Sequence, residues 1–232
     1  ALCRQGWRVR VATRRPHLAG DVKLAGDVGQ VQLVQANVRN RASIKRALEN
    51  ADAVINMVGI LSERGSQSFA GTQSQGATNI AQLAAEAGIK QFVLVSAIGA
   101  SSKSRARYAS TKAEAEAATL AAIPTATILR PSILFGPEDG FFTRFAEMAR
   151  MSPALPLIGG GTTKFAPVFA GDVGEAVSWL DGLPLDALTA ERLYDAMSRA
   201  CGFQHPETIT WLKEGQTVFK AKISQLAEYM RG

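Results

Sequence analysis

Cysteine and histidine are scarce in this chain of 232 residues, which contains two of each. The two cysteines, Cys3 and Cys201, lie far apart and give no disulfide framework, so a reducing compartment is expected. Four scattered cysteine and histidine residues also provide no dedicated zinc site, and we predict no bound metal. The first residues, Ala1 to Gly6, show no secretory signal pattern.

Long hydrophobic runs are lacking too. The longest apolar stretch, residues 92–100, is interrupted by Ser96 and is too short to cross a bilayer, so no transmembrane segment is predicted. The net charge is +6, and residues 1–50 hold ten lysines and arginines against three acidic residues. Such a basic region can attract phosphate, nucleic acid or an anionic membrane surface. Only Trp7 interleaves with these cations, so we predict no nucleic-acid partner.

Short apolar segments alternate with amphipathic ones along most of the chain. The expected strands are residues 9–13, 31–36, 53–58, 92–96 and 125–129. The expected helices are one capped by Ser43, one ending near Gly88 and one over residues 105–122. Alternating strands and helices predict an α/β fold with a doubly wound parallel sheet. After residue 137 the alternation of strands and helices ends, and helices are expected over residues 141–151, 173–180, 191–200 and 222–230.

One pair of residues has a spacing that is typical of acid–base catalysis. Tyr108 and Lys112 are four residues apart on a predicted helix, so the phenol and the ammonium can converge on one face. A nearby cation favours phenolate, which would lower the pKa of Tyr108 and make it a general acid or base. Ser96 ends a strand upstream and can share a substrate oxygen with Tyr108, although Ser101 or Ser102 could take this role. A half-buried tyrosine beside a solvated lysine fits the same pattern.

The order of these features resembles the extended and atypical short-chain dehydrogenase/reductase superfamily, the NAD-dependent epimerase/dehydratase type, over about residues 7–177. The residues that carry the resemblance are the strand ending at Ser96, the Tyr108-x-x-x-Lys112 helix and residues 129–137. Residues 93–100, 128–132 and 159–168 resemble most the NADPH-binding accessory subunit family of respiratory complex I (NADH:ubiquinone oxidoreductase) and its bacterial relatives.

This resemblance implies a domain organisation. Residues 1–137 would form a Rossmann-like NAD(P)-binding domain that lacks the first strand and the Gly-rich phosphate loop. Residues 138–232 would form a small C-terminal region of the substrate-binding type, with residues 166–180 returning to the main domain.

The resemblance also assigns cofactor contacts. Arg14 and Arg15 follow the second strand of the fold, where an acidic residue would bind NAD and an arginine pairs with the 2′-phosphate of NADP. We therefore expect NADPH as the cofactor. The other implied contacts are Asn37 and Val38 beside the adenine, Asn56, Val58 and Gly59 over the ribose, Tyr108 and Lys112 at the nicotinamide ribose, and Pro131, Ser132 and Ile133 near the carboxamide.

Three functions are compatible with these residues. The first is an accessory subunit of complex I in which NADPH is structural, held by partner subunits in the cytoplasm or on the cytoplasmic (matrix) side of the inner membrane. The second is an active NAD(P)H-dependent oxidoreductase, or a sugar-nucleotide epimerase or dehydratase, that uses Ser96, Tyr108 and Lys112. The third is an NADPH-sensing regulatory module that binds a protein partner. The resemblance favours the first, and whether the chain is an enzyme stays open.

Overall fold

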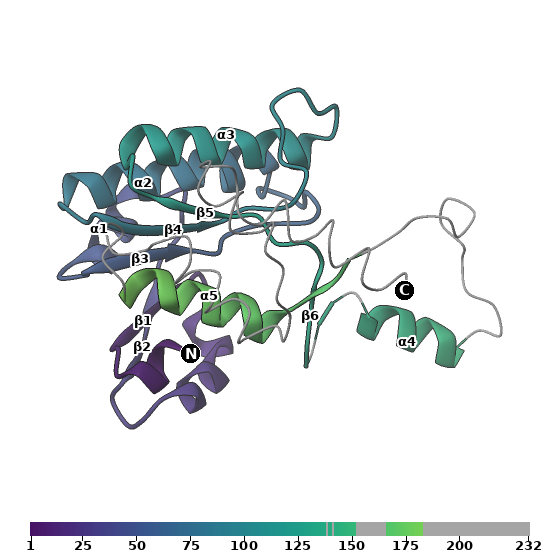
Figure 1. The fold of residues 1–232 in the computed structure, drawn as a ribbon, viewed down its shortest axis with the longest axis horizontal. Coiled ribbons are helices and arrows are strands. Elements are labelled where there is room, and N and C mark those ends of the chain that lie inside the picture. Colours follow the sequence, from purple (N-terminus) through teal and green to yellow (C-terminus); the bar gives the residue numbers. More distant parts are fainter. Residues whose placement is uncertain (138, 141, 152–165, 183–232) are drawn as a thin grey trace, which may run out of the picture. The chain divides into compact units, whose positions relative to one another are not determined.

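The computed structural model describes residues 1–137, 139–140, 142–151 and 166–182 (Figure 1). The chain divides into two compact units, of which the first comprises residues 1–130 and 177–182 and the second begins at residue 131. The helices expected over residues 191–200 and 222–230 lie outside the described residues.

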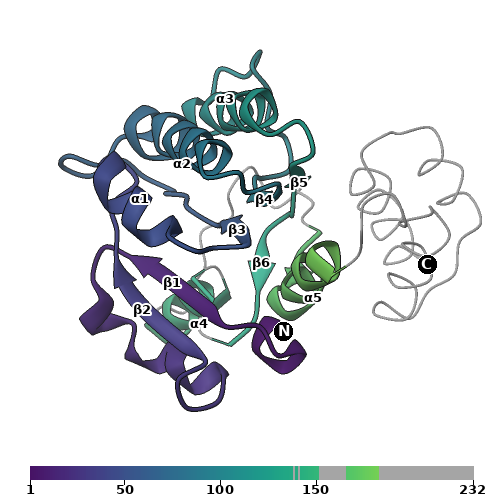
Figure 2. The same cartoon turned by 90° about the vertical axis from the view of Figure 1, so that its left-hand side faces the viewer.

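The strands of the first unit form two parallel sheets (Figure 2). β1 (Val9–Thr13) pairs with β2 (Val31–Gln35), while β3 (Ala53–Asn56), β4 (Gln91–Val95) and β5 (Thr127–Leu129) pair in that order. The predicted α/β fold with parallel strands is confirmed.

Three helices pack on the three-stranded sheet and enclose the core of this unit. They are α1 (Arg41–Leu48), α2 (Gln75–Glu86) and α3 (Arg107–Ala122), and α2 and α3 lie on the same face of the sheet (Figure 1). β4 is buried from Phe92 to Val95, as expected for a central strand covered on both faces. Ala81 and Ala84 are fully buried on α2, where small side chains let the helix approach the strands. The core comprises Ile44, Ala77, Ile80, Ala81, Leu83, Ala84, Ile89, Phe92, Leu94, Ala115 and Ile123.

Two local features differ from the sequence-based expectation. Asn40 is the N-cap of α1, because its side-chain oxygen accepts from the backbone N–H of Ser43 at 3.1 Å. The prediction that Ser43 caps this helix was wrong, since the helix begins two residues earlier. A short π-helix over Ala70–Ser74 precedes α2 and was not foreseen. Such local widenings of a helix often occur at functional sites.

The second unit contains a small parallel pair, β6 (Leu134–Phe135) and β7 (Val168–Phe169). α4 (Phe142–Met151) matches the predicted helix, and α5 (Ala170–Gly182) begins in this unit and ends in the first. The Phe135 ring lies 6.1 Å from the Phe142 ring and 5.6 Å from the Phe169 ring, centroid to centroid. Among the described residues, no helix has the length and apolar character needed to cross a membrane.

Candidate functional site

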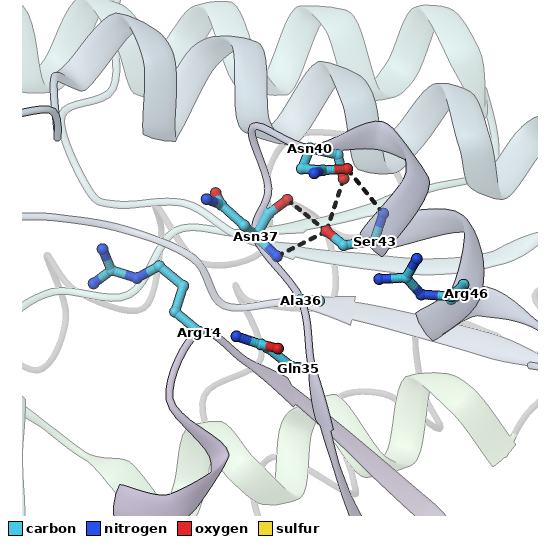
Figure 3. A pocket seen from close by; sticks show the side chains of 7 residues that line it. All are labelled: Arg14, Gln35, Ala36, Asn37, Asn40, Ser43 and Arg46. Atoms are coloured by element: carbon cyan, nitrogen blue, oxygen red, sulfur yellow. Dashed lines mark hydrogen bonds between the residues drawn. The ribbon is translucent and has the colours of Figure 1, made fainter.

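A pocket of about 260 Å³ opens where β1 and β2 end and α1 begins (Figure 3). It is lined by Arg14, Gln35, Ala36, Asn37, Asn40, Ser43 and Arg46. The carboxyl ends of parallel strands are where α/β sheets bind ligands. The pocket therefore occupies the place expected for a nucleotide.

Hydrogen bonds fix the floor of this pocket. The Ser43 hydroxyl lies 3.1 Å from the carbonyl oxygen of Asn37 and 2.8 Å from that of Asn40, and it accepts from the Asn37 N–H at 3.0 Å. The Asn37 side-chain oxygen accepts from the N–H of Arg39 at 3.1 Å. These bonds hold the turn between β2 and α1 in one conformation, so the pocket is preformed.

The sequence-predicted residues of this region separate into two groups. Arg14 and Asn37 line the pocket, whereas Arg15 is exposed and outside its lining. Val38 packs against the core, close enough to α2 that a Cβ atom on Gly76 would lie 2.7 Å from its side chain. Val38 thus packs into the core beside α2 and is not part of the pocket lining.

Arg46 lines the pocket and was not predicted. It lies three residues after Ser43 on α1, so both side chains project from one face of the helix. That spacing was the available signal in the sequence.

A second group of polar residues surrounds α3. Lys112 is 4% exposed, and its ammonium donates to the carbonyl oxygen of Val95 at 3.1 Å. Tyr108 is half-buried, with its ring edge-on to Phe69 at a centroid distance of 6.0 Å. The ammonium is therefore held at the end of β4.

The electrostatics of Tyr108 differ from the expectation. Burial raises the pKa of the Tyr108 phenol above its ordinary value, so the prediction that a cation lowers it was wrong. The reason is that the Lys112 ammonium bonds to a backbone carbonyl instead. Burial also lowers the pKa of Lys112, and the charge of Glu116 opposes that shift. At neutral pH the phenol keeps its proton and can donate a hydrogen bond.

Gln73 links three elements of this region and was missed by the sequence analysis. It is 2% exposed and lies in the π-helix. Its side-chain nitrogen donates to the Thr111 hydroxyl at 3.0 Å, and its side-chain oxygen accepts from the N–H of Ile60 at 3.1 Å. A Cβ atom on Gly59 would lie 3.3 Å from Lys112 Nζ and 3.5 Å from Gln73 Oε1. Gln73 therefore holds the loop after β3 against the helix that carries Lys112.

An ion pair anchors the other end of this group. Arg130 donates to Glu116 through Nε at 2.9 Å and also through Nη2, which makes the pair bidentate. Glu116 is 5% exposed, and Arg130 bonds to both of its carboxylate oxygens. Neither residue was predicted. A glutamate on an alanine-rich helix reads from the sequence as a solvated surface residue.

Residues 1–145 match the family described as NAD(P)H-binding. The chain belongs to this family. It is therefore an NAD(P)H-binding domain, with the Rossmann-like fold predicted from its sequence.

Relatives and solved structures agree with this assignment. Subunit 9 of the NADH dehydrogenase [ubiquinone] 1 alpha subcomplex, a mitochondrial protein of Arabidopsis thaliana, is 41% identical over 67% of the chain and 39% of its own length. The ceramide reductase of Caulobacter vibrioides is 32% identical over 68% of the chain and 48% of its own length. The chain thus spans less than half of each relative. A dTDP-glucose 4,6-dehydratase double mutant from Streptomyces venezuelae shares the fold, with a TM-score of 0.62 at 20% identity over 85% of the chain and 72% of the enzyme.

Two orphaned polar atoms of the NAD(P)H-binding domain test whether its residues fit a nicotinamide cofactor. Asn56 ends β3 and Ser96 follows the adjacent β4, and both side chains are buried. Asn56 Nδ2 and Ser96 Oγ have no hydrogen-bond partner within the described part of the chain. Buried polar atoms are normally satisfied, so two orphans at the carboxyl ends of neighbouring strands suit a bound polar ligand. Ser101 and Ser102, the alternatives to Ser96, are exposed.

The remaining predicted residues occupy different positions. Val58 donates its N–H to the Asn56 side-chain oxygen at 3.0 Å, which fixes the start of the loop after β3. Pro131, Ser132 and Ile133 begin the second unit, where the Ile133 carbonyl accepts from the N–H of Val168 at 2.9 Å. Within the described residues there is no cluster of three or more histidine, cysteine or acidic residues that could hold a metal ion.

Proposed function

We propose that this domain binds NADPH as the nucleotide-binding part of an accessory subunit of NADH:ubiquinone oxidoreductase (respiratory complex I), in which the cofactor stabilises the protein. The observation that carries the proposal is Arg14, a cation that has no counter-ion among the described residues and lines a preformed pocket at the ends of β1 and β2. A 2′-phosphate on the adenosine ribose is the group that an arginine recognises there. The similarity to the Arabidopsis subunit supports the assembly.

In this proposal each group of residues holds one part of the cofactor. Arg14 binds the 2′-phosphate, and Asn37 lies beside the adenine. The preformed loop after β3, with Asn56 and Gly59, receives the ribose. Tyr108, Lys112 and Ser96 would hold the nicotinamide end. Because the Tyr108 phenol keeps its proton, it serves this binding as a donor.

Cofactor affinity tests the proposal. NADPH and NADH are titrated calorimetrically into wild-type protein and the Arg14→Asp variant. Losing a charge-assisted bond and adding a like charge should weaken NADPH by at least about tenfold while NADH changes little. Equal losses for the two cofactors would remove Arg14 from the 2′-phosphate site.

The assembly is tested separately. We propose that the domain associates with other complex I subunits on the cytoplasmic (matrix) side of the inner membrane, where its basic first third meets acidic partners or the membrane surface. A tagged protein should copurify with complex I from its native membranes, and NADPH should be found in the preparation. Recovery of the tagged protein only outside the complex would contradict the assembly.

An active oxidoreductase is the second candidate, and one observation favours it. Ser96, Tyr108 and Lys112 are all present at strand and helix positions suited to a carbonyl substrate, and the ceramide reductase of Caulobacter vibrioides is a relative. A bound nicotinamide would supply hydride transfer, and the protonated Tyr108 could donate a proton to the carbonyl oxygen. Turnover of NADPH with a carbonyl substrate that disappears in Tyr108→Phe would establish the enzyme. Consumption at the same rate in that variant would exclude Tyr108 as the donor.

A further inference from the structure

Arg46 and Arg14 line the same pocket from opposite sides of the end of β2. Arg14 follows β1 and Arg46 projects from α1, and the backbone of Ala36 and Asn37 lies between them (Figure 3). The two side chains thus come from different elements and line one pocket.

Neither arginine is bonded to another residue in the part of the chain that the structure describes. In the described residues Arg14 and Arg46 make no hydrogen bond or ion pair, and no carboxylate lines the pocket. Three nearby arginines, Arg10, Arg39 and Arg41, are instead bonded to protein groups. Arg10 donates to the carbonyl oxygens of Ala47 and Glu49 at 2.8 and 2.7 Å.

The same contrast holds for the arginines on either side of Asn40. Arg39 donates to Ser66, and Arg41 forms an ion pair with Glu86 at 3.0 Å. Two arginines that line one pocket without a counter-ion among the described residues indicate an anion site. Their like charges repel each other until an anion binds.

We propose that Arg46 is a second phosphate-binding residue and that it determines, together with Arg14, the preference for a nucleotide with a 2′-phosphate. This inference rests on the proposed binding of NADPH. A phosphate monoester carries nearly two negative charges at neutral pH and offers three acceptor oxygens. One guanidinium satisfies only two of those oxygens in a bidentate bond, so a second arginine from α1 completes the site.

The test is the ratio of NADPH to NADH affinity in the full-length protein. Arg46→Gln should weaken NADPH by about tenfold, the loss of one charge-assisted bond, and should leave NADH within about twofold. Lys45→Gln is the matched control, because Lys45 is the exposed neighbour on α1, loses the same charge and does not line the pocket. It should leave both affinities unchanged. Arg46→Lys should restore most of the NADPH affinity.

Small probes separate the phosphate from the rest of the cofactor. Adenosine 2′-monophosphate should compete with NADPH in the wild type at least about tenfold better than adenosine 5′-monophosphate, and Arg46→Gln should narrow this difference, since Arg14 remains. Inorganic phosphate at the same concentration should compete poorly, since it lacks the adenosine that the pocket also holds.

Three outcomes would overturn the inference. Equal weakening of NADPH and NADH in Arg46→Gln would show that Arg46 contacts the adenine instead. Unchanged affinities in this variant, with a wild type that binds NADPH tightly, would remove Arg46 from the site and leave the proposed function intact. A wild type that binds neither cofactor would overturn both. Because Arg46 is exposed and unpaired, the variant should melt at the wild-type temperature, which a thermal unfolding scan by circular dichroism checks.

Discussion

The pocket beside α1 and the buried polar layer under α3 differ in whether their charged residues have bonding partners in the protein. In the pocket, Arg14 and Arg46 are exposed and have no partner among the described residues. In the buried polar layer, which we define as Gln73, Thr111, Lys112, Glu116 and Arg130, every member bonds to another protein group. Charged side chains without a partner in the protein can select a ligand without stabilising the fold. Side chains that are bonded to other protein groups fix the positions of the elements they join. Removing one of them leaves its partner without a bond or a counter-charge.

The largest effect is expected at the ion pair. Arg130→Met leaves the buried carboxylate of Glu116 without its cation, which should lower the free energy of unfolding by about 3 kcal/mol. Urea denaturation measures the loss. Arg107→Met is the matched control, because its pair with Glu63 spans 3.5 Å and the two side chains are 63% and 36% exposed. That change should cost less than about 1 kcal/mol. Similar small losses for both variants would abolish the contrast between buried and open charge.

A smaller loss is expected when the link through Gln73 is removed. Gln73→Leu leaves the Ile60 N–H without its acceptor and removes the bond that the Thr111 hydroxyl accepts, at a cost of about 2 kcal/mol. Cofactor affinity should fall as well, since the loop at Gly59 is released. Gln75→Leu is the control on the exposed surface of α2, with an expected change below about 0.5 kcal/mol. Wild-type affinity in Gln73→Leu would show that the loop is held by other contacts.

Two orphaned hydroxyls sharpen the comparison further. Ser96 and Thr119 both bury a hydroxyl without a partner in the described part of the chain. Ser96→Ala and Thr119→Val should each raise the free energy of unfolding by up to about 1 kcal/mol, because an unsatisfied polar group is removed. We expect only Ser96→Ala to weaken NADPH, which calorimetry detects. If both variants bind NADPH like the wild type, Ser96 does not belong to the site.

The smallest effect concerns pH. Burial lowers the pKa of Lys112 below its ordinary value of 10.5, so between the two values the unfolded chain binds more protons than the folded chain. Wild-type stability should therefore rise with pH in that window relative to Lys112→Met. Urea denaturation at pH 8 and pH 10 measures the difference.

Tyr108 should change stability in the opposite sense, which separates the two groups. Its pKa is raised above 10.0, so the folded chain keeps the phenol proton longer, and the wild type should lose stability relative to Tyr108→Phe as the pH rises above 10. A flat difference for either variant would mean that the group titrates as it does in the unfolded chain.

Periodicity and local signals were sufficient for the secondary structure of the first unit. The apolar runs that became β1 to β5 and the helical spacing of Ile80, Leu83 and Ala84 predicted a parallel α/β fold, and the structure confirms it. The family resemblance assigned Arg14 and Asn37 to the cofactor, and both line the pocket, because strand ends meet at one edge of a parallel sheet.

Tertiary structure decided the rest. Arg46 reaches the pocket only because α1 packs beside β2, and Gln73 acquires its role from a π-helix that brings it between Ile60 and Thr111. The pKa of Tyr108 was predicted in the wrong direction because spacing along a helix does not reveal that Val95 binds the ammonium of Lys112. The sequence by itself determined the elements and their order, since these depend on local periodicity. Which polar groups are buried, paired or left open depends on contacts between residues distant in the chain, and only the folded structure supplies them.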